Sequence, residues 1–395
     1  MSHLAHSQSR LLSPDSNPLL RFFLKRTFYR QFCAGENPPE VNSTITGLKS
    51  IGFKGVILGY AREVVLNEKQ REDLASCGQD EAAEACIKNE IMPWAKGTLE
   101  TVRLASPTDF VALKFTGAGS QALYDLSRQT GPSKALAEAI DSICTLAAER
   151  GVRLLFDAEQ HAVQAGIDTW TLNYMRKYNV KGSGKAVVYG TYQAYLKATP
   201  SVLASHLAVA RKEGFTLGVK LVRGAYLGSD PRGTIHDTKA DTDSAYDGIA
   251  ESLVHRSYGP ILKPAAGESE FPSVNAVLAG HNHTSVRKVQ TLRTIQAQKG
   301  EEMTDLVYAQ LQGMADEVSC ELVQAGLATD ADAEKVDVPK AYKYLVWGTT
   351  GECMKYLLRR AQENKDAVQR TREGRNAMAA ELVRRCRKVI GFRNA

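Results

Sequence analysis

Residues 217–226 read LGVKLVRGAY, in which a short apolar run with one lysine is followed by Arg223 and Gly224. The segment Leu217–Arg223 has the composition of a buried β-strand. Because side chains alternate along a strand, Lys220, Gly224 and Tyr226 share one face. A lysine that faces a barrel interior is costly unless it is paired. Lys220 is therefore either an interior cation with a functional partner or an outward side chain in solvent.

Seven further segments have the same strand-like composition between turn signals, which gives eight in all. Helical patterns separate most of them. Eight alternations of strand and helix predict an α/β fold, a distorted (β/α)8 barrel, with a doubly wound sheet as the alternative. The other seven strands are expected at Lys54–Tyr60, Phe110–Phe115, Val152–Phe156, Ala186–Gln193, Val274–Gly280, Leu306–Leu311 and Tyr342–Val346. Helices are expected at Ser133–Arg150, Thr199–Glu213, Asp241–Ser257, Thr284–Lys299 and Gly313–Ala325.

The chain divides into an N-terminal arm (1–52), a catalytic barrel (53–364) and a basic C-terminal helix or tail (365–395). Two connections, 61–108 and 256–271, exceed the usual loop length and are expected as insertions over the barrel mouth. The arm is expected to be helical. Its aromatic stripe is expected to pack against the barrel, and it comprises Phe22, Phe23, Phe28, Tyr29 and Phe32.

Composition excludes several classes of protein. With 43% hydrophobic and 24% charged residues in 395, the chain can bury a sizeable core. Seven widely spaced cysteines without a CxxC pair argue against a disulfide framework and against a zinc site, so no metal is expected. No apolar run approaches the roughly 20 residues needed to span a bilayer. No P-loop, GxGxxG turn, HExxH or GxSxG motif is present.

The basic charge is concentrated at one end of the chain. Residues 365–395 hold nine Lys or Arg against three acids, an excess that equals the net charge of +6 for the whole chain. Such a tail can attract anionic lipid, and we expect peripheral membrane contact there in preference to nucleic acid. A charged terminal helix can also be simply a solvated face.

Polar residues stand at the carboxyl ends of several predicted strands, where barrel enzymes assemble their sites. A second signal lies on the helix after the eighth strand, where adjacent arginines suit bidentate capture of a carboxylate. Glu363 stands four residues after Arg359 and can pair with it. Paired arginines also occur on solvated helices. The strand-end residues are Lys114, Asp157, Gln193, His281 and Asn282, and the arginines are Arg359 and Arg360.

Together these motifs resemble the proline dehydrogenase family, in its eukaryotic and particularly fungal single-function form. The resemblance runs in family order from about residue 18 to 370. The segments that carry it are VKLVRGAYL (219–227), HDTKADTDSAY (236–246), AGHNHTSV (279–286), YAQLQGMADEVS (308–319) and YKYLVWGTTGECMKYLLRRAQEN (342–364). Further matching segments are FLKRTFYRQFCAGE (23–36), FVALKFTGAG (110–119), LLFDAEQ (154–160) and GTYQAYLK (190–197).

The resemblance implies FAD across the carboxyl ends of the strands, oxidation of L-proline to Δ1-pyrroline-5-carboxylate, and transfer of electrons to quinone. It implies that Lys114, Arg359 and Arg360 bind the proline carboxylate, with Glu363 orienting an arginine. The residues implied around the pyrrolidine ring are Asp157, Tyr226, Leu311 and Tyr344. Those implied near the isoalloxazine are Gln193, Lys220, Val222, Gly224 and Ala225, and those along the rest of FAD are Thr238, Lys239, Thr242, His281 and Asn282.

Some positions depart from the family pattern. Gly280 stands where many members have threonine, and the first strand ends in LGY (58–60) instead of aspartate-tyrosine. Tyr344 favours proline, because hydroxyproline-specific relatives tend to have a smaller residue there. Two other hypotheses remain open: another cyclic or N-alkyl amino acid as substrate, and a catalytically silent barrel that acts as a scaffold.

The resemblance also implies a mitochondrial, inner-membrane-associated enzyme. The first fourteen residues lack acids but contain one arginine, Arg10, and so resemble a transit peptide only weakly. A cytoplasmic location is therefore the alternative expectation.

Overall fold

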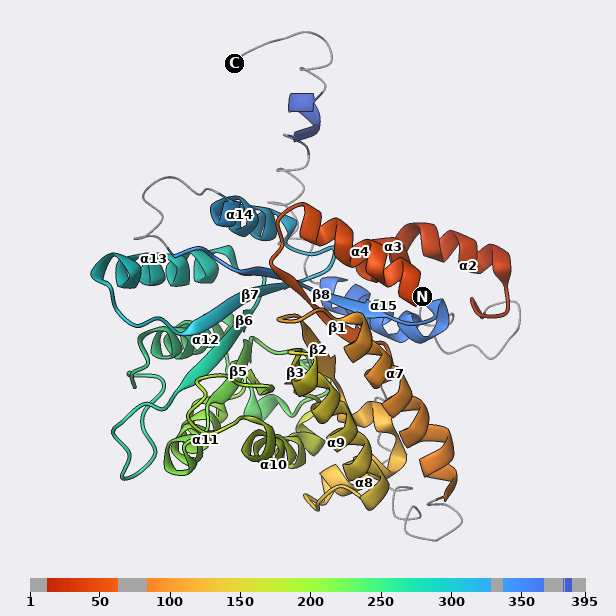
Figure 1. The fold of residues 1–395 in the computed structure, drawn as a ribbon. Coiled ribbons are helices and arrows are strands. Elements are labelled where there is room, and N and C mark those ends of the chain that lie inside the picture. Colours follow the sequence, from red (N-terminus) through yellow and green to blue (C-terminus); the bar gives the residue numbers. More distant parts are fainter. Residues whose placement is uncertain (1–12, 63–83, 328–336, 366–378, 380, 386–395) are drawn as a thin grey trace.

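The computed structural model describes residues 13–62, 84–327, 337–365, 379 and 381–385. Eight parallel strands close into a barrel in chain order, and helices surround it (Figure 1). This closure confirms the (β/α)8 prediction and excludes the doubly wound sheet. The strands are β1 (Gly55–Tyr60), β2 (Phe110–Leu113), β3 (Arg153–Phe156), β4 (Val188–Gln193), β5 (Leu217–Val222), β6 (Val274–Ala279), β7 (Asp305–Leu311) and β8 (Ala341–Trp347).

The five outer helices that were predicted with bounds, α9, α11, α12, α13 and α14, lie within a few residues of their predicted positions. α12 begins with a capping box in which Thr238 and Asp241 satisfy each other's backbone N–H groups, and α11 ends on Gly214 in the left-handed conformation. The helices are α7 (Met92–Leu104), α8 (Ser120–Ser127), α9 (Lys134–Glu149), α10 (His161–Tyr178), α11 (Thr199–Glu213), α12 (Lys239–His255), α13 (His283–Lys299), α14 (Asp316–Leu327) and α15 (Thr350–Lys365).

The barrel interior is apolar toward the amino ends of the strands. Phe110, Tyr189 and Tyr342 pack edge to face there, with centroids 5.3 and 5.6 Å from that of Phe110. The Arg153 guanidinium lies 3.8 Å from the Phe110 centroid and its Nη2 donates to the Tyr342 hydroxyl. Aromatic packing thus fills this half of the barrel and leaves the carboxyl half for polar side chains.

Of the two long connections expected as insertions over the mouth, 61–108 includes residues 63–83, which lie outside the described residues, whereas 256–271 contradicts the expectation. Within 61–108, α7 packs on β1 and α9 and is the ordinary outer helix between β1 and β2. The segment 256–271 joins the carboxyl end of α12 to the amino end of β6, so it lies at the end of the barrel opposite the mouth. Helix-to-strand loops always reach the amino ends of parallel strands, which is why this expectation was wrong.

The N-terminal arm consists of α2 (Pro18–Leu24), a π-helical turn η1 (Lys25–Tyr29), α3 (Arg30–Phe32) and α4 (Pro38–Ser50), and it lies beside α15 (Figure 1). The predicted packing of its aromatic stripe is wrong for three of five residues, because Phe22, Phe23 and Phe28 are 57%, 69% and 48% exposed. Tyr29 is buried and Phe32 is half-buried.

Two parts of the sequence prediction fall mainly outside the described residues. Of the basic tail, only Lys365, Ala379 and residues 381–385 are described, and they are helical. Within the described part of the chain, no helix combines the length and apolar composition that crossing a bilayer requires.

Candidate active site

The centre of the site is a buried ion pair at the carboxyl end of the barrel. Lys220 on β5 points inward and its Nζ lies 2.5 Å from Oδ1 of Asp157, which directly follows β3. Tyr344 on β8 donates its hydroxyl to the other Asp157 oxygen at 2.9 Å, and the lysine lies 5.1 Å from the centre of its ring. The structure therefore brings three predicted site residues from three strands into one cluster and rules out the outward orientation of Lys220.

One edge of this centre is built by β4 and the loop after β5. Gln193 is 3% exposed and accepts a hydrogen bond from the backbone N–H of Ala225 at 3.1 Å. Gly224 has a φ of 151°, and a Cβ atom there would lie 2.5 Å from the Tyr195 ring. Only glycine fits this close approach without strain. Gln193, Gly224 and Ala225, predicted together from sequence, are thus neighbours in space. Gln193 ends β4, and the other two follow Val222, at the end of β5, by two and three residues.

The helix α15 supplies the arginines on another side. The Arg359 guanidinium lies 5.5 Å from the ring of Tyr226, in the loop after β5. Arg360 is 7% exposed and lies 5.4 Å from the ring of Tyr356, one turn earlier on α15. The predicted pairing of Arg359 with Glu363 concerns a side chain outside the described residues.

A small cavity of about 10 Å³ lies between Tyr344 of the central cluster and Tyr356 of α15, with room for about one water molecule. It places Lys114 next to Tyr344 and next to Tyr356 of α15. Tyr60, whose role the sequence left undecided, also lines it and donates to Glu352 Oε1 at 2.8 Å. Lys114 therefore lies beside Tyr356 of α15, and its predicted action with Arg359 and Arg360 stays a prediction.

Tyr356 is a site residue that the sequence reasoning missed. It is 6% exposed, and burial raises the pKa of its hydroxyl, which keeps the group neutral. This hydroxyl has no hydrogen-bond partner in the described part of the chain. The available signal was spacing: residues 356, 359 and 360 share one face of a helix.

The remaining predicted residues lie at the amino ends of α12 and α13. Thr238 caps α12, Lys239 pairs with Asp243, and Thr242 donates weakly to the Thr238 carbonyl. His281 Nε2 accepts a hydrogen bond from the Leu311 backbone at 3.1 Å, and Asn282 caps α13. His281 and Leu311 are thus in contact, whereas these hydrogen bonds and ion pairs of Thr238, Lys239 and Thr242 lie within α12 and its cap.

Arg223 at the end of β5 offers a test of whether the site suits an anionic cofactor such as FAD. Its guanidinium binds Asp243 and Ser285 and stacks on the Tyr246 ring. Its Nη1 is buried, has no hydrogen-bond partner in the described residues and would lie 3.3 Å from a Cβ atom at Gly280. A buried donor beside two helix amino ends suits phosphate or carbonyl oxygens. The residues present therefore fit a flavin nucleotide.

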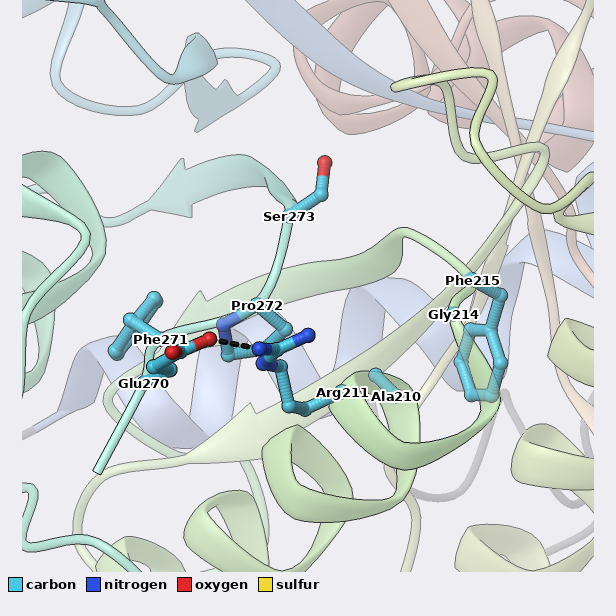
Figure 2. A pocket seen from close by; sticks show the side chains of 8 residues that line it. All are labelled: Ala210, Arg211, Gly214, Phe215, Glu270, Phe271, Pro272 and Ser273. Atoms are coloured by element: carbon cyan, nitrogen blue, oxygen red, sulfur yellow. Dashed lines mark hydrogen bonds and ion pairs between the residues drawn. The ribbon is translucent and has the colours of Figure 1, made fainter. Parts of the chain in front are cut away.

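A separate pocket of about 340 Å³ lies at the opposite end of the barrel (Figure 2). It is formed around Phe215 and Ser273, just before β5 and β6, and an ion pair joins Arg211 to Glu270 at its side. Barrel enzymes hold their sites at the carboxyl ends of the strands. This pocket is therefore distant from the chemistry of the Lys220 cluster.

Comparison with known proteins agrees with this geometry. The family model described as "Proline dehydrogenase" matches residues 41–373. A probable mitochondrial proline dehydrogenase of Schizosaccharomyces pombe is 30% identical over 420 residues, covering 93% of this chain and 80% of that protein. A human hydroxyproline dehydrogenase is 29% identical, covering 93% of this chain and 84% of that protein.

Solved structures support the fold. Proline utilization A from Bdellovibrio bacteriovorus superposes with a TM-score of 0.61 at 20% identity, covering 86% of this chain and 33% of that longer protein. Such a likeness at low identity shows the architecture. Because the family model matches most of this chain, the chain belongs to the proline dehydrogenase family and is an oxidoreductase.

Proposed function

We propose that this protein oxidises L-proline to Δ1-pyrroline-5-carboxylate with FAD and passes the electrons to a quinone. The observation that carries this proposal is the buried cluster of Asp157, Lys220 and Tyr344, at the barrel end that α15 supplies with two arginines. It combines a buried, water-poor site with cations that can bind a carboxylate. Membership of the proline dehydrogenase family supports the substrate class.

The substrate carboxylate is bound by Arg359, Arg360 and Lys114. Guanidinium groups hold carboxylates in a bidentate geometry, and Glu363 orients one of them. The pyrrolidine ring lies between Asp157, Tyr226, Leu311 and Tyr344. Tyr356 lines the same cavity as Lys114 and Tyr344, and it closes the site on the α15 side.

In this proposal, the main role of the protein is to align the substrate with the cofactor. When bound, FAD supplies the acceptor for the hydride that leaves the ring carbon beside nitrogen. The chain binds the neutral amine, holds that carbon at about 3–3.5 Å from the acceptor atom and excludes bulk water. Asp157 and Lys220 hold each other in a fixed geometry, so the cation near the reacting edge does not need to reorganise.

The cofactor is held by two groups of residues. Gln193, Lys220, Val222, Gly224 and Ala225 bind the isoalloxazine, and the positive φ at Gly224 lets the backbone approach it. Thr238, Lys239, Thr242, His281 and Asn282 bind the ribityl, phosphate and adenosine parts.

The direct test is anaerobic mixing of the flavin-loaded protein with L-proline. We expect the oxidised flavin absorbance to bleach and the product to trap as an adduct with an aromatic amine. Protein that holds no flavin and fails to bleach added FAD in the presence of L-proline contradicts the proposal. The same assay on Arg359→Met should show a loss of a few kcal/mol, mostly in apparent substrate binding.

A second candidate substrate is hydroxyproline, because a human hydroxyproline dehydrogenase is 29% identical to this chain. We favour proline, since the Tyr344 ring occupies the barrel centre and its hydroxyl is already engaged by Asp157. Reduction rates with proline, hydroxyproline, pipecolate and N-methyl amino acids decide the matter. A preference for proline by orders of magnitude excludes the others.

We propose a mitochondrial location, as the relatives from Schizosaccharomyces pombe and Homo sapiens are named mitochondrial proline dehydrogenases. Inner-membrane contact through the basic residues 365–395 brings the enzyme to its quinone. Deleting residues 371–395 tests the tail. Liposome binding that stays unchanged at low salt after the deletion contradicts a membrane role for it.

A further inference from the structure

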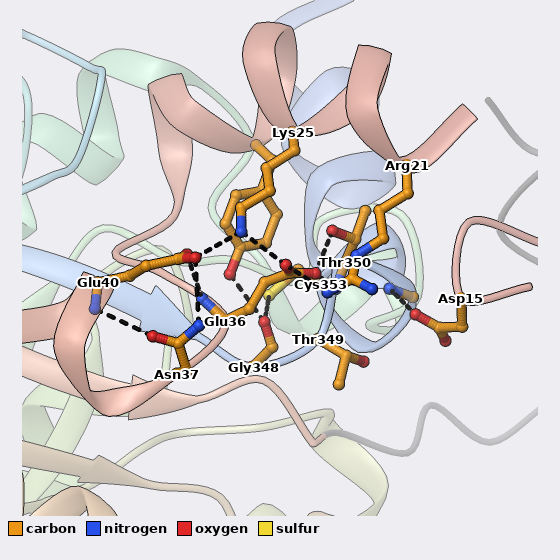
Figure 3. A network of polar contacts seen from close by, with 12 residues as sticks. Asp15, Arg21, Lys25, Glu36, Asn37, Glu40, Gly348, Thr349, Thr350 and Cys353 are labelled. Atoms are coloured by element: carbon orange, nitrogen blue, oxygen red, sulfur yellow. Dashed lines mark hydrogen bonds and ion pairs between the residues drawn. The ribbon is translucent and has the colours of Figure 1, made fainter. Parts of the chain in front are cut away.

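The amino end of α15 is held by the N-terminal arm through a buried carboxylate (Figure 3). Oε1 of Glu36 accepts hydrogen bonds from the backbone N–H of Thr350 at 2.9 Å and from its hydroxyl at 2.6 Å. The Glu36 side chain is 5% exposed and Thr350 is fully buried. A carboxylate at the amino end of a helix accepts hydrogen bonds from the free N–H groups there, and its negative charge is stabilised by the positive end of the helix dipole.

Two cations of the arm fix Glu36 from its other side. Arg21 Nη2 and Lys25 Nζ both lie 2.8 Å from Oε2. Burial alone raises the pKa of Glu36, but the hydrogen bonds from Arg21, Lys25 and Thr350 outweigh it and lower the pKa to about 2. The carboxylate is therefore charged and held between α2 and α15 at any physiological pH.

Further arm residues hold the turn that leads into α15. Asp15 Oδ1 accepts a hydrogen bond from the Gly351 N–H at 3.0 Å, and the Tyr29 hydroxyl donates to the Gly348 carbonyl at 2.7 Å. A Cβ atom at Gly351 would meet the Asp15 carboxylate, so a larger residue there would displace this side chain. The arm thus forms hydrogen bonds with Gly348, Thr350 and Gly351, at the junction between β8 and α15.

The same helix carries Tyr356, Arg359 and Arg360. Arg359 lies nine residues after Thr350, which is about 13 Å along a helix axis. A tilt of about 10° at the amino end would move the guanidinium by about 2 Å. Displacements of this size cost orders of magnitude in rate when they misplace a substrate.

We propose that Glu36 is a positioning residue, which fixes the amino end of α15 so that Arg359 and Arg360 meet the substrate carboxylate. The inference rests on the proposed carboxylate-binding role of these arginines. It assigns to the arm a part in substrate selection, because an arm that releases α15 weakens binding of the carboxylate and leaves the ring site and the flavin site unaltered.

The test compares L-proline with pyrrolidine, the same ring without a carboxylate, by anaerobic flavin reduction. In Glu36→Ala we expect the efficiency with proline to fall about tenfold, with the effect in apparent affinity, and the efficiency with pyrrolidine to stay within about twofold. Glu40→Ala is the matched control, since Glu40 accepts hydrogen bonds from Lys25 and from the Glu36 backbone, both within the arm. It should keep the wild-type preference.

A second pair of variants keeps the test decisive if Glu36→Ala does not fold. Thr350→Val removes the hydroxyl donor and retains the backbone N–H, so the preference for proline should fall in the same direction by a smaller factor. Thr350→Ser restores the hydroxyl and should restore the preference.

Two results overturn the inference in distinguishable ways. Equal losses with proline and pyrrolidine in Glu36→Ala and Thr350→Val mean that these residues act on general stability, and the positioning role is then wrong. A wild-type protein that does not prefer proline over pyrrolidine, with Arg359→Met unchanged in this ratio, removes the proposed carboxylate clamp itself and the inference with it.

Discussion

The Lys220 ammonium and the Asp157 carboxylate meet in the barrel centre at 2.5 Å, with only 6% and 8% of their side chains exposed. They come from β5 and from the end of β3, 63 residues apart in sequence. Tyr344 from β8 adds a hydrogen bond to the second carboxylate oxygen. Each charge therefore depends on the other for its compensation, since little water reaches either.

Removing one member of this pair should destabilise the protein more than removing both. We expect Asp157→Leu and Lys220→Met each to lower the free energy of unfolding by about 3 kcal/mol, because a buried charge is left uncompensated. The double variant should recover a large part of the loss. Urea unfolding of the four flavin-free proteins measures this coupling, and strictly additive losses contradict it.

Gly224→Ala should release the flavin. The new methyl group would lie 2.5 Å from the Tyr195 ring, at a φ of 151° that non-glycine residues rarely adopt, so the loop beside Ala225 must move. The matched control is Gly228→Ala in the same loop, where a Cβ atom meets nothing within 4 Å. We expect the FAD dissociation constant, measured by fluorescence, to rise at least tenfold in the first variant only. Equal flavin affinity in both variants argues against a flavin contact at Gly224.

His206 should make the protein less stable in mild acid. Burial, with a smaller contribution from Arg176, lowers the pKa of His206 from 6.5 to about 4. Between these values the unfolded chain binds the proton and the folded chain does not, so stability falls as the pH drops from about 6.5 to 4 and changes no further below that. The full effect is about 3 kcal/mol.

This pH effect is measured as the difference in unfolding free energy between wild type and His206→Gln from pH 7 to pH 4. The variant should lose less stability in that window, and exposed His255→Gln serves as its control. Parallel curves for wild type and His206→Gln would show that His206 is not the residue responsible.

The outward face of the arm should tolerate polar substitution. Phe22 and Phe23 are mostly exposed, so we expect replacing both with serine to change the free energy of unfolding by less than about 0.5 kcal/mol. The adjacent Leu24 is 5% exposed within the core cluster beside α15, and Leu24→Ala should cost about 2–5 kcal/mol. A large loss in the Phe22/Phe23 variant means that this face is covered in solution.

Tyr344→Ser should shift the substrate preference toward hydroxyproline. The substitution removes a ring from the barrel centre and frees Asp157 from one hydrogen bond, which provides both room and an acceptor for an added hydroxyl. We expect the ratio of flavin reduction rates, hydroxyproline over proline, to rise about tenfold, in line with the 1–3 kcal/mol of a single polar contact. Tyr344→Phe, which keeps the ring, should leave that ratio nearly unchanged.

Strand composition predicted the eight strands and favoured a barrel, but it left a doubly wound sheet as the alternative. All eight strands lie within a residue or two of the predicted segments, because parallel barrel strands are short, apolar and bounded by turns. The polar residues at their carboxyl ends were also predictable, since all parallel strands end at the same rim. The pairing of Lys220 with Asp157 was not predictable, because it depends on the barrel register and not on either residue's neighbours in sequence.

Three aromatic residues of the arm were wrongly predicted to face the barrel, because a π-helical turn interrupts the helix. The inward residues Leu20, Leu24, Tyr29 and Cys33 are spaced by four, five and four, and the step of five falls at the π-helical turn Lys25–Tyr29. A regular helix of 3.6 residues per turn does not keep these positions on one face. The sequence alone gave no sign of the π turn, so the phenylalanines were assigned to the wrong side.

The bond between Glu36 and Thr350 spans 314 residues of sequence. During synthesis the arm is made before the barrel, yet the helix that it holds is made after all eight strands. Contacts of such separation form late and at a high entropic cost. A nascent chain can therefore build much of its barrel before Glu36 can hold α15, and under the positioning role proposed above the carboxylate site is complete only when the arm meets this helix.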